Sequence, residues 1–202
     1  MEINPASLQW KDAYKLLVGS ILPRPIAFVS TTNAYGQDNL APFSFFTAIC
    51  ANPMMVCFSP MRRGSDGKKK DTLRNIEETG EFVINIVGEP LVQQMHACSA
   101  ELPYNVDEFE AVGLGKERSI TVKPPRVKES LVHLECVLDQ VLHYGEEAGG
   151  GSLVIGKVLH VAVSNELYKN GRINTEKLNP VGRMAGAAYT LPMAKMFEIQ
   201  RK

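Results

Sequence analysis

Three short segments of the 202-residue chain hold residue types suited to a ligand that combines a flat ring system with a phosphate. Residues 70–72, Lys-Asp-Thr, open a predicted helix, and a cation and a hydroxyl at a helix start can hold a phosphate. Residues 39–44, Asn-Leu-Ala-Pro-Phe-Ser, predict an extended strand in which Pro42 requires an edge, a bulge or a bend. Residues 23–25, Pro-Arg-Pro, lead into another apolar strand. Such extended backbone can face the edge of a ring system.

The segment before the predicted helix is the one strongly basic stretch of the sequence. Within residues 60–70, Asp66 is the sole acidic residue beside two arginines and three lysines. Arg62 or Arg63 could add a charge-assisted bond to a phosphate, worth roughly 1.5–3 kcal/mol. Asp71, predicted as the N-cap, would repel a dianion near the same N–H groups. We therefore expect the phosphate to lie against the side chains of Lys70 and Thr72.

The elements that must position these residues are mostly strands. Strands are predicted over residues 24–31, 39–50, 54–59, 81–87, 131–143 and 152–163, mostly from alternating apolar residues and, over 54–59, from a short apolar run bounded by prolines. Short helices are expected from residue 71 to a stop at Gly80 and from Pro90 onward. Residues 99–118 form a long excursion that either covers a pocket or holds a helical turn over 106–109. Many strands with two or three short helices indicate an antiparallel barrel and exclude a parallel nucleotide-binding sheet.

The sequence excludes a phosphate-binding loop and disfavours several other classes of protein. Residues 151–157 satisfy G-x-x-x-x-G-K, but Val158 follows where a phosphate-binding loop needs Ser or Thr, and the segment continues as a strand. The sequence contains no G-x-S-x-G motif, the strand-to-helix turn that would indicate a nucleophilic hydrolase. The formal net charge of zero argues against nucleic-acid binding. Four scattered cysteines and four scattered histidines give no metal-ligand spacing.

The length of the chain and its first residues indicate the number of domains and where the protein is located. A chain of 202 residues suits one domain. Its first nine residues include Glu2 and no apolar run typical of a signal peptide, and no stretch reaches the ~18 apolar residues of a spanning helix. A cytoplasmic protein is therefore expected.

Four stretches resemble the FMN-binding split-barrel family of flavin reductase-like domains, in particular its flavoredoxin-like branch. They are residues 23–32, 39–46, 70–85 and 181–189. The resemblance implies a mainly β fold, a six-stranded antiparallel Greek-key split barrel with a few short helices. It implies one domain over 1–202, with a core of about 15–165 and a C-terminal segment 166–202 that closes the flavin site. It also implies a homodimer with FMN at the interface.

The resemblance assigns cofactor-binding roles residue by residue. Arg24, Ser30 and Thr31 would line the flavin or ribityl chain, and Ala41, Pro42, Phe43 and Ser44 would present backbone and hydroxyl groups to it. Lys70 and Thr72 would hold the phosphate. Arg183 and Tyr189 would close the site. Which of Lys68, Lys69 and Lys70 points inward stays open. No catalytic side chain is expected, because the flavin carries the chemistry.

The implied function is an NAD(P)H:flavin oxidoreductase, in which hydride passes from the nicotinamide C4 to the flavin N5. Two alternatives remain: an electron carrier that passes electrons from FMN to a partner protein, and a module that binds FMN without turnover. NADH and NADPH are both possible donors. The sequence carries no nicotinamide fingerprint, but in this fold the nicotinamide ring can stack on the flavin without one.

Overall fold

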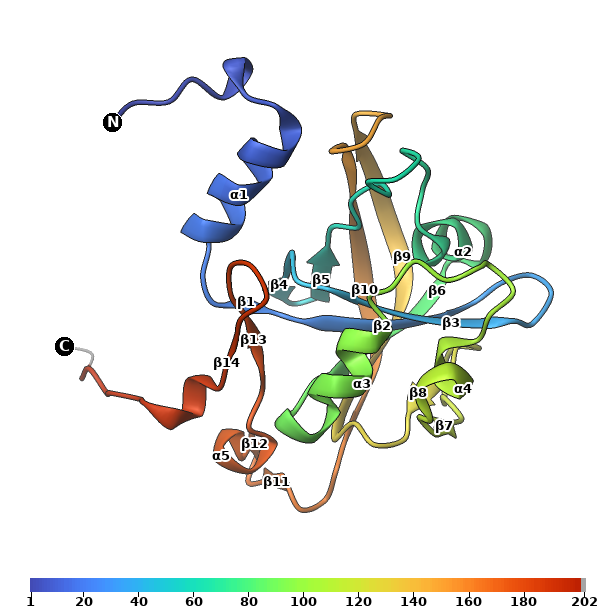
Figure 1. Cartoon of the computed structure of the whole chain (residues 1–202). Coiled ribbons are helices and arrows are strands. Elements are labelled where there is room, and N and C mark those ends of the chain that lie inside the picture. The colour runs from blue at the N-terminus through green and yellow to red at the C-terminus, as the bar shows by residue number, and fades with distance from the viewer. Residues whose placement is uncertain (201–202) are drawn as a thin grey trace.

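The computed structural model describes residues 1–200, and an antiparallel barrel forms its centre (Figure 1). The strands lie side by side in the order β3-β2-β6-β9-β10-β5-β4, and every neighbouring pair is antiparallel. Their bounds are β2 Ala27–Thr32, β3 Asp38–Phe43, β4 Phe46–Ala51, β5 Met54–Phe58, β6 Glu81–Ile86, β9 Val132–Tyr144 and β10 Gly151–Val163. The predicted antiparallel architecture is confirmed.

Strands β3 and β4 are two halves of one bent strand. They lie at opposite edges of the sheet, yet only Ser44 and Phe45 separate them in the chain. The bend therefore joins the two edges into a barrel, and with β3 and β4 counted as one strand the barrel has the predicted six. Of the edge, bulge or bend predicted at Pro42, the edge is confirmed: Pro42 stays in the edge strand β3, opposite Phe28, and does not interrupt it. An edge strand tolerates a proline, because its missing N–H is not needed there.

The helices and the short strands lie around the barrel. The helices are α1 Trp10–Ser20, α2 Asp71–Thr79, α3 Val92–Ala97, α4 Glu108–Val112 and α5 Thr175–Leu178, with 3-10 turns at Pro5–Ser7, Glu89–Leu91 and Pro192–Ala194. The short strands are β1 Arg24–Pro25, β7 Lys116–Glu117, β8 Arg126–Val127, β11 Tyr168–Lys169, β12 Arg172–Ile173, β13 Gly182–Arg183 and β14 Tyr189–Thr190. Strands β1, β13 and β14 form a small sheet that joins the two ends of the chain.

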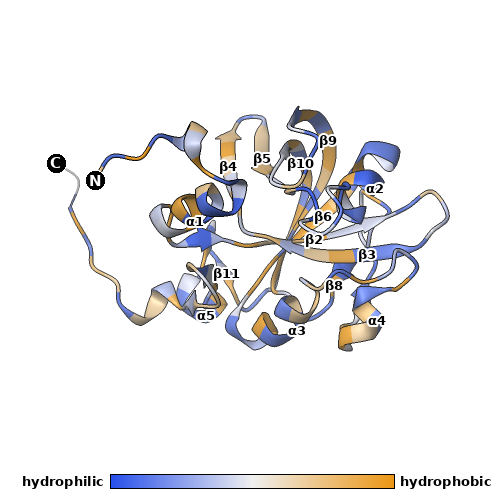
Figure 2. Cartoon of the chain, turned by 45° about the horizontal axis from the view of Figure 1, so that its top comes forward, coloured by the Kyte–Doolittle hydropathy of each residue, from blue (hydrophilic) through white to orange (hydrophobic). Residues whose placement is uncertain are grey.

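Helix α1 is absent from the elements predicted from the sequence. Its apolar residues do not share one buried stripe, because Val18 is its one buried residue while Tyr14, Leu16 and Leu17 are exposed. The helix lies at one side of the barrel in Figure 1, where Trp10 packs against Gly149 in the loop between β9 and β10, and Figure 2 shows apolar residues along it. None of the helices in residues 1–200 is long and apolar enough to cross a membrane.

Two helix starts differ from the prediction. Lys70 is the N-cap of α2, and Asp71 is its first helical residue, so the assignment of Asp71 as N-cap is wrong. The carboxylate of Asp71 is instead turned toward two arginines. Helix α4 begins two residues later than the expected turn over 106–109, because the side chain of Asp107 caps it by accepting from the N–H of Phe109. Gly80 ends α2 at a φ of 72°, as predicted.

Two apolar clusters place the helices against the barrel. The inner cluster fills the barrel, and Phe43, Phe58 and Phe82 pack in it with neighbouring ring centroids 5.1 and 5.7 Å apart. The outer cluster joins Phe28 and Leu40 of the sheet to Met95 of α3 and Phe109 of α4. Since side chains alternate along β2 and β3, one face of these strands fills the barrel, where Leu73 and Ile76 of α2 also pack, and the other face packs against α3 and α4. This fixes α3 and α4 beside the edge of β3.

Candidate functional site

The open edge of β3 is the backbone feature around which the site is built. Strand β3 pairs with β2 on one side only. On the other side, the N–H of Leu40 donates to the carboxylate of Glu108 at 3.0 Å. Pro42, two residues further on, has no N–H to donate. Two adjoining cavities lie along this edge, and both include Pro42 and Ser99 in their walls.

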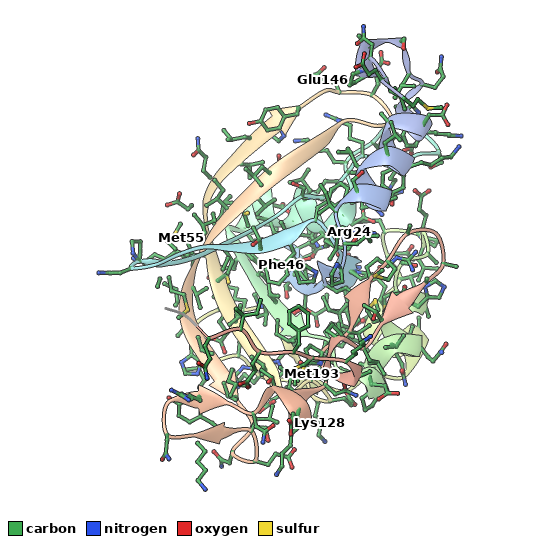
Figure 3. All side chains as sticks on the ribbon, turned by 90° about the vertical axis from the view of Figure 1, so that its left-hand side faces the viewer. Arg24, Phe46, Met55, Lys128, Glu146 and Met193 are labelled. Atoms are coloured by element: carbon green, nitrogen blue, oxygen red, sulfur yellow. The ribbon has the colours of Figure 1, made fainter. Side chains whose placement is uncertain are left out.

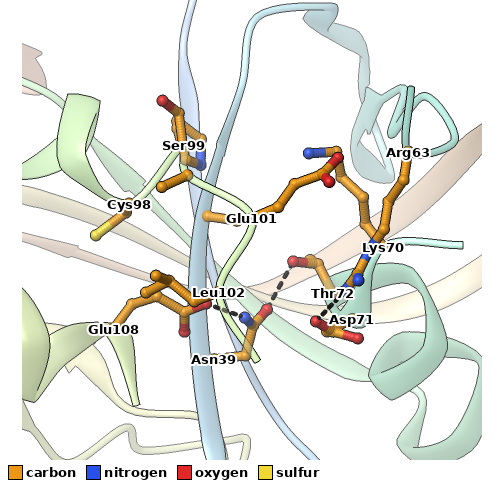
Figure 4. A pocket seen from close by; sticks show the side chains of 13 residues that line it. Asn39, Arg63, Lys70, Asp71, Thr72, Cys98, Ser99, Glu101, Leu102 and Glu108 are labelled. Atoms are coloured by element: carbon orange, nitrogen blue, oxygen red, sulfur yellow. Dashed lines mark hydrogen bonds and ion pairs between the residues drawn. The ribbon is translucent and has the colours of Figure 1, made fainter. Parts of the chain in front are cut away.

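The first cavity, here called the α2 cavity, lies between β3 and the start of α2 (Figure 4). It has a volume of about 60 Å³ and brings Ala41 and Pro42 of the edge strand close to Lys70 and Thr72. The first N–H groups of an α-helix have no partner within the helix and carry a partial positive charge. A small cavity at this end of α2 therefore suits an anionic group.

Lys70 is the lysine of the basic run that lines the α2 cavity. Lys68 instead forms an ion pair with Asp66 at 3.5 Å, and Lys69 pairs with Glu77 at 2.7 Å. Burial lowers the pKa of Lys70, with the nearby Glu101 acting in the opposite direction. No ion pair of Lys70 occurs within residues 1–200, although Figure 4 shows its side chain and that of Glu101 pointing toward one another. The Lys70 ammonium is thus available to a ligand.

The charge of Asp71, which could repel an anion, is matched by two cations. Arg63 Nη2 lies 2.6 Å from Asp71 Oδ2, and Arg74 Nη1 lies 3.4 Å from Oδ1. Arg63 also lines the α2 cavity. The charge of Asp71 is therefore compensated, whereas the carboxylates of Glu101 and Glu108, which also line the α2 cavity, accept hydrogen bonds from neutral donors.

A chain of hydrogen bonds fixes the wall of the α2 cavity. The Thr72 hydroxyl donates to Asn39 Oδ1 at 2.7 Å, and Asn39 Nδ2 donates to Glu108 Oε1 at 2.9 Å (Figure 4). Burial raises the pKa of Glu108, and its hydrogen bonds oppose the rise. The carboxylate of Glu108 thereby anchors both the edge strand and the Asn39 side chain.

The second cavity, here called the Tyr189 cavity, lies further along β3 and has a volume of about 200 Å³. Pro42 and Ser44 of the bent strand meet Arg183 and Tyr189 of the C-terminal segment in its walls. The Arg183 guanidinium lies over the Tyr189 ring, 4.4 Å from its centroid, and the Tyr189 hydroxyl lies 3.0 Å from His96 Nδ1. The cavity thus has an aromatic and cationic wall.

The structure brings seven of the eleven predicted cofactor-binding residues to these adjoining cavities. They are Ala41, Pro42, Ser44, Lys70, Thr72, Arg183 and Tyr189. The other four, Arg24, Ser30, Thr31 and Phe43, are absent from both walls.

Arg24 joins three parts of the chain. Its guanidinium donates to the carbonyls of Val18, Ile21 and Met184 and to the Ser44 hydroxyl, at 2.9 to 3.2 Å. Figure 3 shows it at the inner end of α1, and its side chain is buried. Arg24 therefore positions the bend at Ser44 against both chain ends.

Ser30, Thr31 and Phe43 are occupied within the protein. Ser30 and Thr31 point to opposite faces of β2: the Ser30 hydroxyl donates to the carbonyl of Pro125, whereas the Thr31 hydroxyl accepts from Asn75 at 3.0 Å. Phe43 packs in the inner cluster against Phe58. All three are buried.

Sequence reasoning missed Glu108, Glu101 and His96. Glu108 and Glu101 come from the long excursion over residues 99–118, and their partners lie 36 to 69 positions away. No periodic pattern signals such a contact. His96 lies on the predicted helix that follows Pro90, where its solvent-facing position gave no signal.

Comparison with known proteins identifies relatives along most of the chain. Residues 18–177 match the family model described as flavin reductase like domain. A relative from Halalkalibacterium halodurans, itself uncharacterized, is 42% identical over 191 residues, which cover 94% of this chain and 91% of the relative.

Two solved structures share the architecture. The nitrilotriacetate monooxygenase component B from Bacillus cereus has a TM-score of 0.92 and 40% identity, with 98% of each chain covered. A protein from Shewanella frigidimarina with a split barrel domain has a TM-score of 0.83 and 24% identity, with 100% of each chain covered. The second likeness concerns the fold alone, and it agrees with the barrel closed by the β3–β4 bend.

Proposed function

The chain belongs to the flavin reductase-like family, and from that premise we propose that it is an FMN-binding oxidoreductase that takes hydride from NAD(P)H. The observation that carries this proposal is the adjoining pair of cavities along the open edge of β3. One suits an anion, and the other has an aromatic and cationic wall. This is the order of groups in a flavin mononucleotide, from phosphate to ring system.

The residues present fit the phosphate end of FMN. Lys70 supplies a cation, Arg63 balances Asp71, and the first N–H groups of α2 supply donors. The hydroxyl of Thr72 donates to Asn39 here and would have to turn toward the phosphate in order to add a further bond. Lys70 is therefore the side chain expected to contribute most.

The ring end is assigned to the Tyr189 cavity and the backbone of residues 41–44. Ser44 offers a hydroxyl that Arg24 holds in place, and Arg183 stacked on Tyr189 closes the far wall. When bound, the flavin supplies hydride acceptance at N5, so no acid–base pair of the chain is required. The side chains orient the ligand and keep water from one edge of it.

A second copy of the chain is part of the proposal. Tyr14, Leu16 and Leu17 of α1, and Ile49 of β4, are large apolar residues at 39 to 50% exposure. Apolar surface of this kind supports burial against another protomer. Light scattering of the purified protein is expected to give about twice the chain mass of 22.3 kDa.

The visible absorption spectrum tests the function. The protein loaded with FMN is titrated anaerobically with NADH and then with NADPH, and the flavin band is followed. Bleaching by either nucleotide is expected and identifies the donor. A bound flavin that neither nucleotide bleaches would replace the reductase by an electron carrier or a binding module. Failure to bind added FMN would overturn the cofactor assignment.

A further inference from the structure

A third cavity, here called the basic cavity, opens beside the α2 cavity and has no role in the assignment above. The two share Arg63 and Asp71 in their walls. The basic cavity has a volume of about 530 Å³. Five cations line it, Arg62, Arg63, Lys68, Lys69 and Arg74, against the two carboxylates Asp66 and Asp71. Its lining therefore carries an excess of three positive charges.

The cations are only partly matched by internal partners. Arg62 donates from Nε and Nη1 to the carbonyls of Gly145 and Gly67, and Lys69 is held by Glu77. Lys68 lies 3.5 Å from Asp66 with its side chain 77% exposed, and that of Arg74 is 52% exposed. Lys68 and Arg74 are therefore the cations that a soluble anion can reach most easily.

The same cavity holds a flat stacking surface. The Arg74 guanidinium lies over the ring of Tyr104, with Cζ 4.4 Å from the centroid. Tyr104 is held in place from its hydroxyl, which donates to Asn75 Oδ1 at 3.2 Å and accepts from Asn33 Nδ2 at 3.1 Å. A guanidinium supported in this way presents its outer face to an aromatic base, and arginine planes and aromatic rings both stack nucleobases.

We propose that the basic cavity binds a phosphorylated adenosine, with its phosphate on the cations and its purine on the Arg74–Tyr104 pair. The proposal rests on the proposed function in one respect: the rest of the nucleotide extends toward the α2 cavity and the Tyr189 cavity, where FMN is placed. FAD and NADPH are the two ligands that this cavity would favour, FAD over FMN, which has no adenosine, and NADPH over NADH, which has no 2′-phosphate. FAD would place its 5′-adenylate here, next to the flavin phosphate at Lys70, whereas NADPH would place its 2′-phosphoadenosine here.

Direct binding of 5′-AMP and 2′-AMP by titration calorimetry tests the cavity without any need for flavin. The wild type is compared with the double variant Lys68→Gln/Arg74→Gln, and Lys128→Gln, an exposed cation that lines neither cavity, is the matched control. One of the two adenylates is expected to bind the wild type with a Kd of about 1 mM or tighter. The double variant is expected to bind the same adenylate about tenfold more weakly. Absence of adenylate binding, or full binding by the double variant, would overturn the proposal.

Flavin and donor titrations then separate the two sources. If FAD is the source, FAD binds the wild type more tightly than FMN, and the double variant loses that preference while it keeps its FMN affinity. If NADPH is the source, the KM for NADPH lies below that for NADH, and the double variant makes the two equal. If the protein binds an adenylate but no flavin, the proposal for the basic cavity stands and the proposed function is contradicted.

Discussion

At the scale of single residues, Lys70 is expected to supply most of the phosphate affinity. Lys70→Ala should weaken FMN binding by about tenfold or more, because a charge-assisted bond of roughly 1.5–3 kcal/mol is lost. Flavin fluorescence quenching measures the Kd. Riboflavin, which has no phosphate, should bind the wild type and the variant equally, and Lys69→Ala should keep FMN affinity because Lys69 pairs with Glu77. Full FMN affinity in Lys70→Ala would contradict the phosphate assignment.

Glu101 is expected to compete with the ligand for Lys70. Its carboxylate accepts from the Ser65 hydroxyl at 2.7 Å and faces Lys70 across the α2 cavity (Figure 4). Glu101→Gln removes a negative charge that a phosphate would meet, so FMN should bind about two- to fivefold more tightly, as expected for an exposed charge pair.

The control for this change is Glu110→Gln, which removes an exposed carboxylate of α4 that does not line the α2 cavity. Its FMN Kd should match that of the wild type. Equal or weaker FMN binding by Glu101→Gln would show that Glu101 supports the ligand rather than competing with it.

At the scale of elements, one glycine decides how β10 packs. A Cβ at Gly156 would fall on the ring of Phe82, which is fully buried in the inner cluster. Gly156→Ala should therefore lower the free energy of unfolding by about 1–3 kcal/mol through overpacking. Urea denaturation measures this change.

Gly19→Ala in α1 is the matched control, because nothing lies within 4 Å of a Cβ at Gly19. Alanine favours a helix interior over glycine, so this variant should be unchanged or slightly more stable. A Gly156→Ala protein as stable as the wild type would mean that β10 shifts freely past Phe82.

The strands were predictable from sequence, and the helices less so. The apolar pattern over residues 81–87 and 131–143 is a local property of the chain and predicted β6 and β9, although the structure buries both faces of β6. Helix α1 was missed although Trp10, Ala13, Tyr14, Leu17 and Val18 recur at helical spacing, so the sequence did carry a signal for it. An edge, a bulge or a bend was predicted at Pro42. The structure has the edge there and the bend two residues later, at Ser44, and the sequence could not separate these alternatives because they depend on which strands close the barrel.

The site was predictable where local chemistry marks it. A lysine and a threonine at a helix start, and a proline in a strand, led to Lys70, Thr72 and Pro42. Glu108 could not be found, because its bond to Leu40 spans 68 positions and no motif signals it. The fourfold hydrogen bonding of Arg24 likewise depends on three segments that meet only in the folded chain.

At the scale of the whole molecule, one buried histidine should make stability depend on pH. Burial, with the nearby Arg126, lowers the pKa of His133 to about 4 from 6.5. Its Nδ1 lies 2.9 Å from Asn85 Oδ1, and the neutral ring is kept in the folded state. Between pH 6.5 and 4 the unfolded chain binds the proton and the folded chain does not. The contribution of the neutral His133 to the free energy of unfolding is therefore complete above pH 6.5 and is lost as the pH falls from 6.5 to 4.

Urea unfolding at pH 7 and pH 5 checks this expectation against His133→Gln. The wild type should lose about 2 kcal/mol more than the variant between these two pH values. Glu135 accepts hydrogen bonds from Thr121, Ile120 and Arg126, which lower its pKa to about 2. It therefore changes the pH dependence of stability mainly below pH 4.5, and it does so equally in both proteins. Identical pH dependence of the two proteins would rule out His133 as the titrating group.

The open edge of β3 has a consequence for solubility. An unpaired edge strand is a template on which another chain can add a strand and begin an aggregate. Here the N–H of Leu40 is already bonded to Glu108, and Pro42 presents none, so an incoming strand would find two of its expected donors missing. The same two residues that leave room for a ligand along the barrel therefore also protect the protein from fibril-like self-association.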